Sequence, residues 1–253
     1  MMKITTIFLI LVSFSLNSFA TEESLKSFIL TGYDEDNKKK WEMKGDNANI
    51  SNQDVFLTTV QAKVYEDNQV IDIEADKGYI NKSSRNVSLK ENVVLKDSKG
   101  AVLYTEMLNW DQEKDIVWTD VFLKLVKDEN EIVGTGAKID TQFRKAVIQK
   151  DVQLKLIPQT IITSSGPLEV DYIENVAVFK EDVHIVDRRG ELFCDTLIVY
   201  FDAEEKSIIK AHAKGNVSLR RGQSWTYSKE AIYDVKEGKV SLLGRPKLEI
   251  YPQ

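Results

Sequence analysis

Hydrophobic and polar residues alternate along almost the whole chain. The clearest case is Val152-Gln153-Leu154-Lys155-Leu156, and the same alternation occurs from Val60 to Val64 and from Ile71 to Ala75. Because successive side chains of a strand point to opposite faces, this period of two predicts strands with one apolar face and one wet face. No long stretch has helical periodicity. The chain is therefore predicted to be all-β, with antiparallel strands.

One hairpin pattern occurs twice. The segment from Lys90 to Gly100 matches the segment from Lys180 to Gly190 at five positions, and in both an alternating apolar run meets a charged turn closed by Gly. Glycine accepts the positive φ that a tight reversal often needs, so each copy predicts a β-hairpin. Strand starts are also expected at a spacing of roughly thirty residues, which indicates a duplicated β unit. These starts are predicted near Asp76, Glu106, Lys138, Glu169, Asp195 and Glu230.

The prolines divide the chain. All four lie after Ile157, at Pro158, Pro167, Pro246 and Pro252. Because proline cannot donate a hydrogen bond to a strand ladder, it collects at strand ends and sheet edges. A boundary near Pro158 is therefore predicted, with one β unit over residues 28–157 and a second over residues 160–253.

Composition and charge exclude several classes of function. The single cysteine, Cys194, rules out an intramolecular disulfide and is expected to be a buried hydrophobe, and two histidines are too few for a metal cluster. A formal charge of −6 does not suit nucleic acid, whose phosphates require a basic surface. We expect no metal, no cofactor, no nucleic-acid partner and no catalytic residues.

Residues 1–20 have the pattern of a signal peptide. Lys3 gives a positive start, the run from Ile4 to Leu16 is apolar, and Ser18-Phe19-Ala20 offers small residues for cleavage. The apolar run is shorter than the roughly twenty residues of a transmembrane helix. Cleavage after Ala20 and export to the periplasm are predicted, with an uncleaved N-terminal anchor at the inner membrane as the alternative.

Several strand-and-turn motifs resemble the periplasmic proteins of lipopolysaccharide export. The first half is similar to LptC, the inner-membrane-associated component, at Gly32 to Asp36, Trp41 to Asp46 and Val152 to Lys155. The second half is similar to the OstA-like domain of LptA at Gly166 to Val170, Gly190 to Asp195, Ala213 to Val217 and Leu243 to Lys247. The resemblance implies two stacked antiparallel β-jellyrolls, one LptC-like and one OstA/LptA-like. It also implies a non-enzymatic bridge component that carries the acyl chains of lipid A in an apolar groove, from the inner-membrane ABC transporter towards the outer membrane.

Strand parity gives candidate lipid-binding residues for such a groove. Each CH₂ removed from water is worth ~0.8 kcal/mol, so a carrier of acyl chains needs a continuous apolar lining. The residues predicted to face it are Val93, Leu95, Val121, Leu123, Val152, Leu154, Val183, Ile185, Val217 and Leu219. A filled β-sandwich needs the same residues, so a secreted structural or adhesion protein with a filled core is the alternative. A carbohydrate-active enzyme on a β-scaffold would instead need paired carboxylates in a cleft.

Partner binding is predicted at the sheet edges, where unpaired backbone groups can template another strand. Lys247, Leu248, Glu249 and Ile250 are expected to pair with a further LptA-like or outer-membrane Lpt protein. The strands around Phe28 to Tyr33 are expected to meet the periplasmic jellyrolls of the inner-membrane Lpt transporter. Arg188-Arg189 could meet lipid phosphates, although charge at a hairpin tip is usually only solvated.

Overall fold

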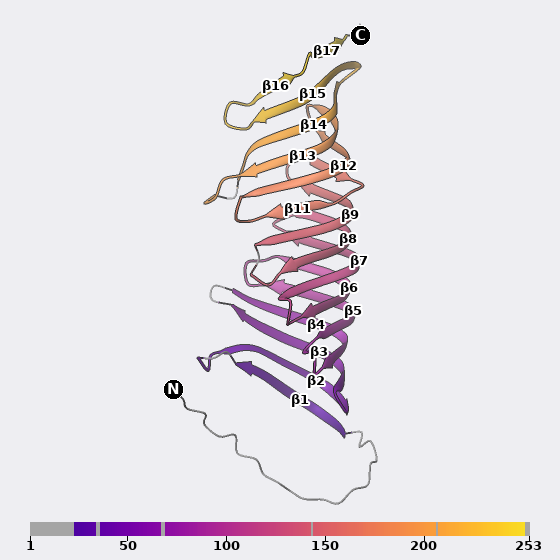
Figure 1. Ribbon diagram of the computed structural model, residues 1–253, viewed down its shortest axis with the longest axis vertical. Helices are drawn as coiled ribbons and strands as arrows, with labels where there is room; N and C mark the ends of the chain where they lie inside the picture. Colours follow the sequence, from indigo (N-terminus) through magenta and orange to yellow (C-terminus); the bar gives the residue numbers. More distant parts are fainter. Residues whose placement is uncertain (1–22, 34–35, 67–68, 143, 206, 251–253) are drawn as a thin grey trace, which may run out of the picture.

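The computed structural model describes residues 23–33, 36–66, 69–142, 144–205 and 207–250. These residues form one sheet of 17 strands, and every pairing in it is antiparallel. Figure 1 shows the strands stacked in chain order into a long column, with β1 at one end and β17 at the other. The prediction of an all-β, antiparallel protein is confirmed, and the stacked, bent strands are consistent with a β-jellyroll.

The strands are β1 (Glu23–Tyr33), β2 (Lys39–Ser51), β3 (Asp54–Glu66), β4 (Gln69–Asn81), β5 (Val87–Asp97), β6 (Val102–Asp111), β7 (Ile116–Lys127), β8 (Asn130–Asp140), β9 (Lys145–Leu156), β10 (Thr160–Ser164), β11 (Leu168–Asp171), β12 (Val176–Asp187), β13 (Gly190–Phe201), β14 (Ile208–Arg221), β15 (Ser224–Asp234), β16 (Lys239–Leu243) and β17 (Lys247–Glu249). In the part of the chain that the structure describes, no helix is long and apolar enough to span a bilayer. The predicted signal peptide, residues 1–20, lies outside the described residues.

Two of the prolines interrupt strands. β9 and β12 each pair with both β10 and β11, so these two short strands together occupy the place of one long strand that is broken around Pro167. In the same way β16 and β17 both pair with β15, and Pro246 lies in the break between them. Because proline cannot donate a backbone hydrogen bond to the ladder, each strand is interrupted at its proline.

Most of the long strands bend at their centres. The register shifts between Lys90 and Val93 in β5 and between Lys180 and Val183 in β12. At both bends an acid and its neighbour have positive φ, for example 66° and 50° at Glu181 and Asp182. Asp and Asn tolerate this left-handed conformation better than most residues, and the resulting bulge turns the strand. Each bent strand is thereby divided into two arms.

The bends correct the prediction of strand starts. Asp76, Glu106, Asp195 and Glu230 lie inside β4, β6, β13 and β15, at the points where the register of these strands shifts. Lys138 also lies inside a strand, β8, whereas Glu169 is the second residue of β11, as predicted. The regular spacing of acids along the sequence therefore marks bulges as well as turns, because short polar side chains suit both. Similarly, β1 begins at Glu23, upstream of the predicted start of the first unit at Phe28.

Buried residues form two core clusters along the column. The first includes Phe28, Leu57 and Val93 from the N-terminal strands, and the second includes Val152, Phe179 and Val217 from the C-terminal strands. Val152 precedes Pro158 yet packs in the second cluster, and the strand ladder continues through this region without interruption. A division of the chain into two units at Pro158 stays a prediction.

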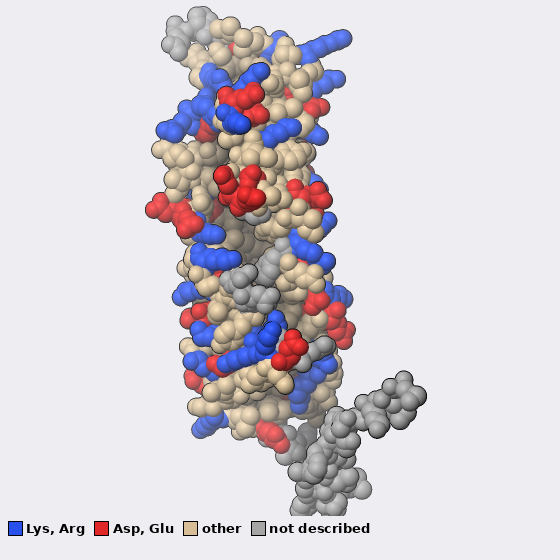
Figure 2. Space-filling model, turned by 90° about the vertical axis from the view of Figure 1, so that its left-hand side faces the viewer, with Lys and Arg blue, Asp and Glu red and all other residues tan. Residues whose placement is uncertain are grey.

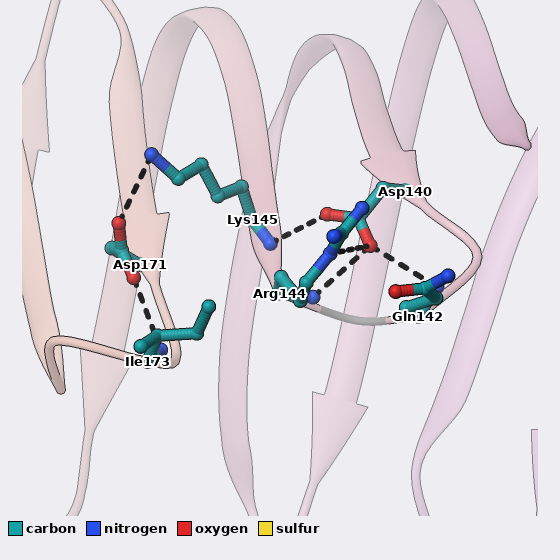
Figure 3. A network of polar contacts seen from close by, with 6 residues as sticks. All are labelled: Asp140, Gln142, Arg144, Lys145, Asp171 and Ile173. Carbon is teal, nitrogen blue, oxygen red and sulfur yellow. Dashed lines mark hydrogen bonds and ion pairs between the residues drawn. The ribbon is translucent and has the colours of Figure 1, made fainter. Parts of the chain in front are cut away.

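A polar network spans the strands on either side of Pro158 (Figure 3). The backbone N–H of Lys145, at the start of β9, donates to Asp140 Oδ2 at 2.8 Å, while its Nζ lies 3.2 Å from Asp171 Oδ2. Asp171 also accepts a hydrogen bond from the backbone N–H of Ile173 at 3.0 Å. The two carboxylates thus order the turns after β8 and β11 and tie both to β9.

Candidate functional site

The ten predicted inward residues fall into two layers. Those nearest the bends are fully buried, whereas the next ones outward along each strand are half-buried. The fully buried residues are Val93, Leu123, Val152, Val183 and Val217, and the half-buried ones are Leu95, Val121, Leu154, Ile185 and Leu219. Among these ten residues, exposure is therefore greater away from the bends, whereas on the facing arms residues near the strand ends, such as Ala177 and Val199, are also buried.

Val121 does not fit this order. It lies in the bulge of β7, where the register shifts between Thr119 and Phe122, and it is half-buried. The fully buried residues that flank this bulge are Thr119 and Leu123. Sequence parity cannot locate a bulge, which shifts the facing of every later residue.

A cavity of about 310 Å³ lies between the two arms of the C-terminal strands. One arm contributes Ile185, Leu192 and Leu219, which lie between the bends and the β12–β13 and β14–β15 turns. The facing arm contributes residues beyond the bends, including Leu197, Val199, Ala211, Ala213 and Ala231. Of the ten predicted residues, Ile185 and Leu219 line this cavity. The prediction missed the residues of the facing arm. A bend separates them from the alternating segments in which strand parity was used to assign inward residues.

A second hollow of about 290 Å³ continues towards the C-terminal strands. It shares Leu219, Arg221 and Val240 with the first cavity and reaches Leu248 of β17. Figure 2 shows Lys, Arg, Asp and Glu side chains interspersed along the full height of one outer face of the column. Charged residues are thus spread over that face (Figure 2), and apolar lining between the arms leads to the edge that the sequence predicts as a partner site.

The rim of the first cavity carries charged residues. The guanidinium of Arg189 donates to Asp187, with Nη2 and Oδ2 2.6 Å apart. Although partial burial opposes ionisation of Asp187, hydrogen bonds from Arg189 lower the pKa of this carboxyl. Glu191 pairs with Arg220 and with His184, and the hydrogen bond from Arg220 is the main cause of a lowered pKa at Glu191. Both rim carboxylates are therefore ionised and already paired.

The described residues contain little that suggests a reaction centre. Burial raises the pKa of the Cys194 thiol to about 12, which makes this thiol a poor nucleophile and fits its predicted place in the core. Within the described ranges, no group of three or more His, Cys, Asp or Glu side chains could hold a metal ion. The chemistry that the cavity offers is therefore apolar contact, with charge confined to its rim.

Apolar side chains are exposed at both ends of the column. Among the described residues β1 pairs only with β2, and β16 and β17 pair only with β15. Ile29 on β1 is 67% exposed, and Leu248 and Ile250 are 59% and 71% exposed. The predicted edge strand is shorter than expected, because β17 ends at Glu249 and Ile250 follows it.

Two family models match successive parts of the chain. Residues 17–156 match a model described as "Lipopolysaccharide-assembly, LptC-related". Residues 162–252 match a model described as "LptA/(LptD N-terminal domain) LPS transport protein". A search among curated proteins gave no match. The two matched segments meet at the β9–β10 turn.

Proposed function

Because the chain belongs to the LptC-related family of lipopolysaccharide-assembly proteins and continues into an LptA-like segment, we propose that it carries the acyl chains of lipid A between the two arms of its bent strands. The observation that carries this proposal is the apolar hollow lined by Ile185, Leu192 and Leu219 and by the facing arm. An acyl chain of about twelve carbons gains on the order of 10 kcal/mol on leaving water, which polar surface contacts could not replace. The protein would then act in lipopolysaccharide transport without a catalytic step.

The place of action follows from the same families, whose bridge proteins work in the periplasm. We propose that this protein forms part of the bridge there, with its first unit over residues 28–157 and its second over residues 160–253. One column containing both modules would provide a fixed length of bridge, because its strand ladder is continuous from β1 to β17.

The ends of the column are proposed as the joints to neighbouring proteins. The β1 edge would meet a periplasmic jellyroll of the inner-membrane transporter, and the β16–β17 edge would meet the next jellyroll towards the outer membrane. Exposed apolar side chains at Ile29 and Leu248 support this assignment, because an isolated soluble sheet normally protects its edges.

A binding measurement tests the groove. Leu219→Arg places a charge in the lining of both hollows, whereas Ser218→Arg places the same charge on the opposite face of β14. We expect Leu219→Arg to abolish binding of lipid A to the purified protein and Ser218→Arg to leave it intact, with circular dichroism confirming that both variants are folded. Equal binding by the two folded variants would reject the groove and favour a filled-core structural protein.

The edge is tested separately. Proline at Ile250 cannot remove a hydrogen bond between β15 and β17, because Ile250 follows β17. We expect Ile250→Pro to weaken capture of a partner jellyroll while lipid A binding and the thermal unfolding of the monomer stay unchanged. Unaltered capture would remove the C-terminal edge from the proposal without affecting the groove.

A further inference from the structure

One contact crosses the mouth of the first cavity. The guanidinium carbon of Arg189 lies 4.8 Å from the centre of the Tyr233 ring. Arg189 lies in the turn between β12 and β13, and Tyr233 lies in β15, on the opposite arm. Both residues line the cavity. The contact therefore joins the two arms over the apolar space between them.

Two of the other cation–π contacts in the described residues join direct register partners, and a third, between Lys39 and Tyr65, joins the neighbouring strands β2 and β3. Lys210 and Tyr200 are direct partners in the β13–β14 register, and Arg220 and Trp225 are direct partners in the β14–β15 register. Such cross-strand pairs stabilise a sheet wherever they occur. Arg189 and Tyr233 belong to segments that do not pair with each other, so sheet pairing does not account for their contact.

The cavity is lined by two carboxylates, of Asp187 and Glu191, and by two arginines, Arg189 and Arg221. The carboxylates of Asp187 and Glu191 are bound by Arg189 and Arg220. Arg221 also lines the cavity and is exposed, and in the described part of the chain it forms no ion pair. Its Cγ lies 3.2 Å from the position that a Cβ at Gly190 would take, so Arg189 and Arg221 flank this glycine. Of the two arginines that line the cavity, Arg221 is therefore the one without an acidic partner in the described part of the chain.

From this arrangement we propose that Arg189 and Arg221 bind the phosphate group of an amphiphile whose acyl chain occupies the cavity. The proposal rests on the proposed function and adds to it a headgroup site. Arginine presents a planar fork of donors that matches phosphate oxygens. Arg189 holds Asp187 through its Nε and Nη2, so it would offer the phosphate its Nη1 donors, and Arg221 would offer its whole fork. In this structure Arg189 contacts Tyr233, and on binding it would exchange the ring for the phosphate, which would open the mouth between the arms.

The test compares two amphiphiles with the same tail. Dodecyl phosphate and dodecyl maltoside are titrated, below their micelle concentrations, into the full chain by calorimetry. We expect dodecyl phosphate to bind about tenfold more tightly, and the double variant R189Q/R221Q to lose this advantage while it binds dodecyl maltoside as before. R188Q is the matched control, because it removes a positive charge from the same turn at a residue that does not line the cavity. K99Q, the equivalent change in the other hairpin copy, is a second control.

Each alternative outcome has a distinct meaning. Equal binding of the two amphiphiles, or an equal loss in R188Q and R189Q/R221Q, would overturn the headgroup site and leave the groove in place. Displacement of dodecyl phosphate by an equal concentration of inorganic phosphate would also overturn it, because the rim would then bind anions without a tail. Failure of the wild-type protein to bind either amphiphile would overturn the groove itself. Circular dichroism checks that every variant is folded. The double variant R189K/R221K, which keeps the charge but loses the fork, is a further control.

Discussion

The two copies of the repeated hairpin, β5–β6 and β12–β13, have the same turn hydrogen bond and the same bend in the first strand. They differ in the surroundings of their turns. In both, an aspartate accepts a hydrogen bond from the backbone N–H two residues later, at 2.9 Å for Asp97 and 2.7 Å for Asp187. Both first strands bend at a pair of residues with positive φ, and both bury a valine just after the bend. Only the second copy lines the cavity described above, and only there does the turn hold an arginine against the facing arm.

This difference separates the part of the repeat that builds the column from the part that would contact cargo. The bends and the buried valines recur because every strand must turn and close the same side of the sheet. The residues at the turns are free of that requirement, so Lys99 and Arg189 can differ without altering the fold. We therefore expect changes at the bends to affect stability alike in the two copies, and changes at the turns to affect them differently.

The largest effect is expected at the bends. Val93 and Val183 are each 1% exposed, so an aspartate at either position would bury an unpaired charge. We expect Val93→Asp and Val183→Asp each to cost more than about 4 kcal/mol of unfolding free energy, measured by urea denaturation. Val121→Asp, at the half-buried bulge of β7, is the matched control and should cost much less. Unequal losses in Val93→Asp and Val183→Asp would show that the bends are not equivalent.

A smaller and unequal effect is expected at the two turn glycines. At Gly190, with φ of 145°, a Cβ would lie 2.1 Å from the backbone oxygen of Arg220, whereas a Cβ at Gly100, with φ of 89°, has nothing within 4 Å. Gly190→Ala should therefore cost more than about 2 kcal/mol, because a backbone atom must move, and Gly100→Ala about 1 kcal/mol from its positive φ alone. Thermal unfolding of the two variants measures the difference. Equal losses would mean that the hairpins do not differ at their turns.

The smallest effect is a pH dependence at the second turn. Hydrogen bonds from Arg189 outweigh partial burial and hold the pKa of Asp187 below its ordinary value. A carboxyl whose pKa is lower in the folded state stabilises the fold above its unfolded pKa of about 4, and this contribution is lost as the pH falls below that value. Asp187→Asn should therefore flatten the dependence of unfolding free energy on pH below about pH 4, and Arg189→Gln should do so in part. An unchanged slope in Asp187→Asn would contradict the assigned pairing.

Sequence reasoning reached the fold through alternation and through the repeated hairpin, because both depend on local backbone geometry. Strand parity also identified the buried layer at Val93, Val152, Val183 and Val217, and in the structure each of these valines follows an Asp or Asn with positive φ. The sequence did not predict the opposite wall of the cavity, which includes Val199 and Ala211. This wall faces Leu219 only because the strands bend, and strand parity does not predict a bend. The contact between Arg189 and Tyr233 could not be predicted from the sequence for the same reason, because the two residues lie on different arms.

The central claim is that cargo lies between the arms, and crosslinking in cells tests it most directly. A photo-reactive amino acid is placed at Ile185 or Leu219, which line the cavity, and at Ser218, which faces the other way on β14. We expect adducts with lipopolysaccharide from Ile185 and Leu219 and none from Ser218. Adducts from Ser218 alone, or from none of the three positions in cells that assemble their outer membrane normally, would contradict it.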